Sequence, residues 1–160
     1  IDKVTWTINY YFGKEQPDGG APGGPDGYFQ VIDTYVSYAA TSQLSFGLDA
    51  NYVTNEVNQS DPALSLQGIG AYARYQFSFP MALAFRYERL DDEGLFGGVE
   101  QLLQEATVTV ESTFADGFRI RGEYRRDWSD EDVFFKKGLA VNNQNTLTLG
   151  FIYAFTSKAP

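Results

Sequence analysis

The 160-residue sequence predicts an all-β protein, an eight-stranded antiparallel up-and-down transmembrane β-barrel. Three observations lead to this fold class. Segments of about ten residues alternate between apolar and polar side chains, short and long connections alternate between these segments, and aromatic residues gather near both ends of each segment. The length fits one domain, so we expect residues 1–160 to form a single transmembrane barrel domain.

The first four strands are predicted from side chains that share one face at every second position. The second of them, over residues 28–40, has the weakest alternation. The apolar faces of these strands, in chain order, are Val4, Trp6, Ile8, Tyr10 and Phe12; Ile32, Thr34, Val36 and Tyr38; Leu44, Phe46, Leu48, Ala50 and Tyr52; and Ile69, Ala71, Ala73, Tyr75 and Phe77.

The last four strands follow the same rule, with charged residues more frequent on their polar faces. Their apolar faces are Met81, Leu83, Phe85 and Tyr87; Ala106, Val108, Val110 and Phe114; Phe118, Ile120, Tyr124 and Trp128; and Leu147, Leu149, Phe151, Tyr153 and Phe155. Each of the eight segments supplies roughly the 9–11 residues that a tilted strand needs to cross a bilayer.

The connections between the strands alternate in length. Tight turns are expected at 41–43, around Pro80 and at 115–117. Long loops are expected at 14–27, 56–65, 91–101 and 129–144. Short and long connections therefore lie at opposite ends of the strands, which is typical of outer-membrane barrels with short periplasmic turns and longer external loops.

Alternation alone fits two opposite barrels, a soluble one with its apolar face inside and a membrane one with that face toward lipid. The polar faces are nearly free of Lys, and the apolar faces carry aromatic residues at both ends, which favours the lipid-facing orientation. The aromatic girdles would be formed at the turn end by Trp6, Tyr38, Phe46, Phe77, Phe79, Phe114, Phe118, Tyr153 and Phe155, and at the loop end by Tyr10, Phe12, Tyr28, Tyr52, Tyr87, Tyr124 and Trp128.

Outward apolar faces leave the charged side chains in the lumen. The predicted network consists of Asp33, Asp49, Arg74, Arg86, Glu88, Glu105, Glu111, Arg119, Arg121, Glu123, Arg125 and Asp127. A three-residue turn at 115–117 pairs Glu111 with Arg121 across two strands. Because eight strands leave an interior just wide enough for side chains, we expect these charges to fill and lock the barrel. The alternative is an ion pathway in which Arg119, Arg121 and Arg125 form a basic ladder that sets selectivity.

Composition excludes several functions. The formal charge of −9 argues against a nucleic-acid partner, which needs a basic surface. His and Cys are both absent, so we expect no cofactor, no metal site and no His-assisted catalysis. Glu105 and Asp127 are carboxylates that an enzyme could use as acid and base, although a salt-bridging role is favoured. No run of 18 apolar residues predicts a transmembrane helix.

The end of the last strand resembles the assembly signal of outer-membrane barrels, a polar residue followed by glycine and then two aromatic residues. The matching positions are Thr148, Gly150, Tyr153 and Phe155. The wider sequence resembles the C-terminal part of OmpL-like β-barrel porins. This resemblance is carried by Trp6–Gly13, Ala71–Phe77, Arg121–Ser129 and Asn142–Phe155.

The resemblance implies a porin-like protein that is integral to the outer membrane of a Gram-negative-type bacterium. Its expected partners are membrane lipid and lipopolysaccharide, the barrel assembly machinery during biogenesis, and small solutes or ions. Porins of this kind are typically longer, so the chain is expected to be about half of one, or an excised or engineered eight-strand barrel. Three alternatives stay open, namely a segment of a larger aqueous porin, an adhesion or receptor barrel acting through its external loops, and a soluble ligand-binding barrel.

Overall fold

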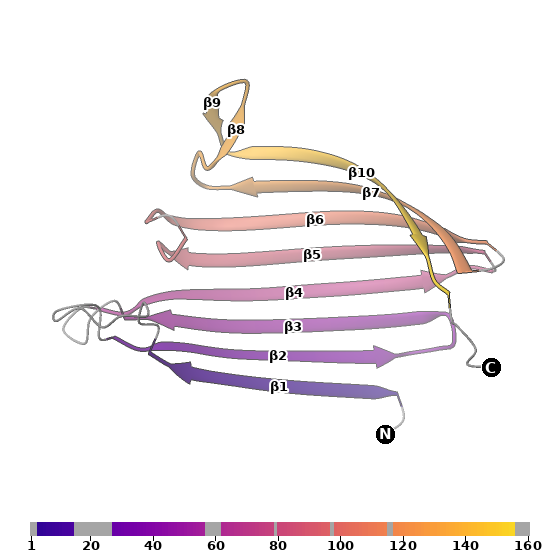
Figure 1. The fold of residues 1–160 in the computed structure, drawn as a ribbon, viewed down its shortest axis with the longest axis horizontal. Coiled ribbons are helices and arrows are strands. Elements are labelled where there is room, and N and C mark those ends of the chain that lie inside the picture. The colour runs from indigo at the N-terminus through magenta and orange to yellow at the C-terminus, as the bar shows by residue number, and fades with distance from the viewer. Residues whose placement is uncertain are drawn as a thin grey trace.

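The computed structural model describes residues 3–14, 27–56, 62–78, 80–96, 98–114 and 117–155, and it consists of one large antiparallel sheet with a small hairpin beside it (Figure 1). The large sheet has eight strands in the order β1-β2-β3-β4-β5-β6-β7-β10. These are β1 (Val4–Gly13), β2 (Phe29–Ala39), β3 (Leu44–Asn55), β4 (Leu64–Gln76), β5 (Met81–Glu93), β6 (Glu100–Thr113), β7 (Phe118–Ser129) and β10 (Asn143–Tyr153).

The sheet is open. Each strand pairs with its neighbours in sequence order, and β1 and β10 form the two edges. The antiparallel up-and-down order is confirmed, whereas the predicted closure of eight strands into a barrel is absent from this structure. Closure requires a ladder between segments about 130 residues apart. Alternating side chains do not encode that ladder, because they look the same in a narrow barrel and in one wall of a wider one.

The turns set the register as the sequence predicts. The backbone N–H of Phe114 donates to the carbonyl of Phe118 over 2.7 Å, which closes the hairpin between β6 and β7. Residues 115 and 116 lie outside the described part. The register confirms the predicted pairing of Glu111 with Arg121, and it also pairs Thr113 with Arg119, Thr107 with Arg125, and Tyr35 with Asp49.

The connections on the other side of the sheet differ from the sequence prediction. β5 continues to Glu93 and β6 begins at Glu100, so the loop expected over 91–101 is much shorter. The loop expected over 129–144 contains a hairpin of β8 (Phe134–Lys136) and β9 (Leu139–Val141). In the loop expected over 91–101, the acidic residues suggested a solvated loop where β5 in fact continues. The expected loop at 14–27 lies mostly outside the described residues, as does half of the loop expected at 56–65, where β4 already begins at Leu64.

Asp92 explains how β5 and β6 are joined. This side chain is fully buried and accepts backbone N–H groups from Gly94 (3.1 Å), Leu95 (2.6 Å) and Phe96 (3.1 Å). Gly94 has a φ of 96°, a conformation that L side chains rarely adopt. Asp92 therefore accepts hydrogen bonds from backbone N–H groups of the turn that have no partner on a neighbouring strand. The sequence gives no sign of this role, because three acidic residues in succession suggest a solvated loop.

The two faces of the sheet differ sharply in burial. Large side chains of the apolar face are exposed, as shown by Trp6 at 67% and Leu147 at 83%. The polar face holds most of the buried polar groups, including Thr107 and Glu111. Among the described residues only Leu66 and Ala82 are buried hydrophobic side chains, and none of the described segments is a helix long and apolar enough to cross a membrane. The sheet therefore has no apolar core on either side.

We predict that Asp92→Ala lowers the free energy of unfolding by about 2 kcal/mol, because buried backbone donors of the turn lose their acceptor. Urea unfolding in detergent micelles, followed by tryptophan fluorescence, measures this change. The matched control is Asp91→Ala, whose carboxylate is 58% exposed and 3.5 Å from Arg89. Its effect should stay below about 0.5 kcal/mol. Equal losses in the two variants would contradict the role given to Asp92.

Candidate functional site: the charged face of the sheet

Four carboxylates lie side by side across the polar face. The register aligns Asp49 with Gly70, Gly70 with Glu88, Glu88 with Glu105, and Glu105 with Asp127. We call these four carboxylates the acidic row. Like charges directly opposite each other on neighbouring strands are destabilising. The row therefore requires positive charge or hydrogen-bond donors close by.

Two arginines supply that charge from the adjacent row of the register. Arg86 donates to both oxygens of Glu105 over 2.8 and 2.9 Å, and its Nε lies 3.7 Å from Glu88. Arg125 lies 3.1 Å from Glu105 and 2.6 Å from Asp127. Each guanidinium thus lies between two neighbouring carboxylates. Bidentate and shared contacts of this kind are the strongest that a side chain offers a carboxylate.

Tyr72 completes the pattern at the other end of the acidic row. Its hydroxyl contacts both Asp49 and Glu88, the latter over 2.7 Å. The two carboxylates reach it because Gly70 lies between them. A Cβ at position 70 would lie 2.8 Å from both carboxylate oxygens of Asp49. Any residue larger than glycine would therefore displace this carboxylate.

A second cluster surrounds Glu111, nearer the turn end of the strands. Its carboxylate lies 3.0 Å from Arg121, 3.2 Å from Arg74 and 3.4 Å from Arg119. Arg121 and Arg119 come from the neighbouring strand β7. Arg74 comes from β4 and crosses β5, where the alanines at 82 and 84 leave room. We call this group of four residues the arginine cluster.

The structure brings most of the predicted network together but divides it differently. Arg119, Arg121 and Arg125 lie on one face of β7 but contact different carboxylates, since Arg119 and Arg121 contact Glu111 and Arg125 contacts Glu105 and Asp127. The predicted pair of Glu111 and Arg121 is confirmed. The contact of Arg74 with Glu111 crosses an intervening strand. The sequence does not predict it, because the rules for cross-strand pairs apply only to adjacent strands.

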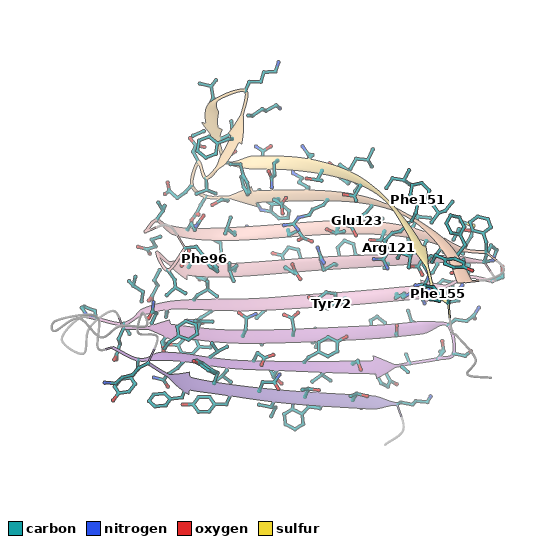
Figure 2. The ribbon with its side chains drawn as sticks, in the orientation of Figure 1. Tyr72, Phe96, Arg121, Glu123, Phe151 and Phe155 are labelled. Carbon is teal, nitrogen blue, oxygen red and sulfur yellow. The ribbon has the colours of Figure 1, made fainter. Side chains whose placement is uncertain are left out.

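Two predicted members lie apart from these ion pairs. Asp33 accepts a hydrogen bond from Asn9 over 3.2 Å on the β1–β2 side of the sheet. Glu123 accepts one from Thr109 over 3.0 Å and has no ion pair among the described residues. Figure 2 shows Arg121 and Glu123 on β7 and Tyr72 across the sheet on β4.

A hollow of about 370 Å³ lies over the polar face between these groups. Its charged and hydroxyl-bearing walls include Arg74, Arg121, Glu111 and Tyr72. The described residues contain no group of three or more His, Cys, Asp and Glu side chains placed to hold a metal ion. The opposed carboxylates of Glu105 and Asp127 share Arg125, which suits charge compensation rather than proton transfer.

The opposite face carries the aromatic residues that the sequence predicts for two girdles. Tyr10, Phe12, Tyr38 and Phe114 are between 44% and 62% exposed. Phe79 lies outside the described residues. The assembly-signal positions Thr148, Gly150 and Tyr153 lie on the edge strand β10, and Phe155 follows it with 80% exposure.

Comparison with known proteins identifies a family. A family model described as "Putative beta-barrel porin-2, OmpL-like" matches residues 1–155. The matched stretch includes all strands of the sheet and both charged clusters. No curated protein matches the chain, and no solved structure does.

We predict that Glu105→Ala lowers the free energy of unfolding by about 2 to 3 kcal/mol, because two arginines lose the carboxylate that they share. Urea unfolding in detergent measures the loss. Glu123→Ala is the control on the same face, and the loss of its single hydrogen bond should cost less than about 1 kcal/mol. An unchanged midpoint for Glu105→Ala would show that the acidic row does not contribute to stability.

Proposed function

This chain belongs to the OmpL-like β-barrel porin family, and on that premise we propose that its sheet forms a wall of an outer-membrane pore. The apolar face contacts lipid, and the polar face lines a water-filled lumen through which small solutes or ions pass. The protein acts as a passive channel and not as an enzyme. Lipid and lipopolysaccharide surround it in the outer membrane of a Gram-negative-type bacterium.

The observation that carries this proposal is the division of the sheet into two chemically opposite faces. Aromatic and aliphatic side chains such as Trp6, Ile69 and Leu149 are more than half exposed on one face. The other face gathers the charged clusters and the hollow over them. A bilayer favours contact with the first face. The second face requires water, because its charged side chains remain partly exposed.

The aromatic positions support a tilted crossing. When the paired residues are followed from strand to strand, Trp6 on β1 lies in the same row as Arg126 on β7. The turn-end aromatic residue of β7, Phe118, lies eight residues before Arg126. Likewise Tyr10 aligns over four steps with Asp91, and Tyr87 lies four residues before it. A shift of about one residue per strand corresponds to strands tilted by roughly 35–45°, given 3.4 Å per residue and 4.8 Å between strands. Membrane barrels have this tilt.

The open edges favour a barrel wider than eight strands. β1 and β10 are each about ten residues long, and within the described part of the chain each has a partner strand on one side only. Unpaired backbone groups are not tolerated in lipid, so both edges require further strands or each other. Pairing with further strands would keep in contact with water the arginines of the polar face, which are 32–45% exposed in this open sheet.

The edge strand β10 also suits a role in biogenesis. Thr148, Gly150 and Tyr153 lie along this strand, whose outer side is free to pair. We include recognition of these residues, together with Phe155, by the barrel assembly machinery in the proposal. An edge strand can add to another strand through main-chain hydrogen bonds.

Because the chain has no Cys, single-cysteine variants test the two faces directly. In planar bilayers we expect stepwise pore currents. A charged, water-soluble thiol reagent should reduce the current of Thr109→Cys, whose side chain lies on the polar face. It should leave Ile69→Cys on the apolar face unchanged, because lipid shields that position.

A fluorophore attached to each cysteine provides the matched control. Lipid-borne quenchers should dim the label at position 69 and leave the label at position 109 bright. A correctly folded protein without pore current would overturn the channel. If the thiol reagent blocked Ile69→Cys and the lipid-borne quenchers dimmed the label on Thr109→Cys, the assignment of the two faces would be reversed.

A further inference from the structure

Charge on the polar face is segregated along the strands. Toward the turn end, the arginine cluster sets three guanidinium groups against the single carboxylate of Glu111. Toward the loop end, the acidic row sets four carboxylates against Arg86 and Arg125. The turn-end cluster therefore has a surplus of positive charge, although the whole chain is acidic.

The arginines of this cluster retain unused donors. Each guanidinium has five N–H donors, and each reaches Glu111 through one terminal nitrogen, over 3.0 to 3.4 Å. The same nitrogen of Arg74 also donates to Gln76 over 3.0 Å. The Glu111 side chain is only 7% exposed, whereas those of Arg74, Arg119 and Arg121 are 40–45% exposed. Glu111 thus fixes the arginines from beneath while much of each guanidinium faces open space.

Two of these arginines, Arg74 and Arg121, line the hollow over the polar face. The hydroxyl groups of Ser45 and Thr109 line it as well, and so do the carboxylates Glu111 and Glu123. Ala82 and Ala84 also line it, and their short side chains leave the hollow unfilled. Guanidinium groups that converge beside neutral hydrogen-bond donors are an arrangement that binds planar or tetrahedral oxyanions.

We propose that Arg74, Arg119 and Arg121 form a binding site for an oxyanion, the carboxylate or phosphate group of a small solute. The inference rests on the proposed pore, which gives solutes access to this face. One arginine would suffice to neutralise Glu111. The other two supply the charge and the fixed fork geometry for a second, external anion.

Two measurements test this site on the protein folded in detergent and in bilayers. Inorganic phosphate should raise the unfolding temperature above that in chloride at equal ionic strength, since a bound ligand stabilises the folded state. Under a KCl gradient, the reversal potential should indicate a preference for chloride over potassium. Arg121→Gln should weaken the phosphate effect and lower the chloride-to-potassium permeability ratio by about twofold or more.

Arg126→Gln is the matched control, because it removes the same charge from the same strand on the opposite face, where Arg126 has no ion pair among the described residues. It should change neither measurement. Glu111→Gln should strengthen both effects, since it removes the competing carboxylate. If these arginines served structure alone, Glu111→Gln would lower stability with no gain in anion binding, and that result would overturn the site.

The outcomes separate this inference from the proposed pore. A phosphate-dependent stabilisation without pore current would overturn the pore and retain the binding site. Pore current with no phosphate effect, and with a selectivity unchanged by Arg121→Gln, would overturn the site and retain the pore. Acetate in place of phosphate distinguishes the two solute classes, because stabilisation by one of them alone assigns the site to a carboxylate or to a phosphate.

Discussion

The polar face of this sheet depends on the compensation of carboxylates that the register places next to one another. Asp49, Glu88, Glu105 and Asp127 would repel if the adjacent row did not place a donor between each neighbouring pair. Tyr72, Arg86 and Arg125 occupy those three places. Because the described residues form no apolar core on either side of the sheet, these shared contacts join neighbouring strands in addition to the backbone hydrogen bonds of the sheet.

The same requirement organises charge along the strands. The two arginines beside the acidic row each contact two of its carboxylates, whereas the three arginines around Glu111 outnumber their carboxylate partner. A solute moving along this face would therefore meet a negative zone and then a positive one. Charged walls select solutes by sign, so the distribution of a few side chains matters more to passage than the total charge of the chain.

Membership of the OmpL-like porin family and the open sheet point to the same architecture. In the proposed pore, β1 and β10 would have to pair with further strands or with each other, because unpaired backbone groups are not tolerated in lipid. The apolar face already has the stagger of a tilted crossing, since its aromatic residues drift by about one position per strand across the register.

The alternation of each strand, the two faces and the register around the tight turns could be predicted from the amino-acid order alone, because they follow from the period of a strand and from local turn geometry. The amino-acid order therefore predicted the pair of Glu111 and Arg121. The tertiary structure decided what depends on three or more strands at once. Arg74 reaches Glu111 across β5, Gly70 makes room for Asp49, and Asp92 holds a turn within the loop expected over 91–101. Closure was also beyond the sequence, because the strand period does not specify how many strands a sheet contains.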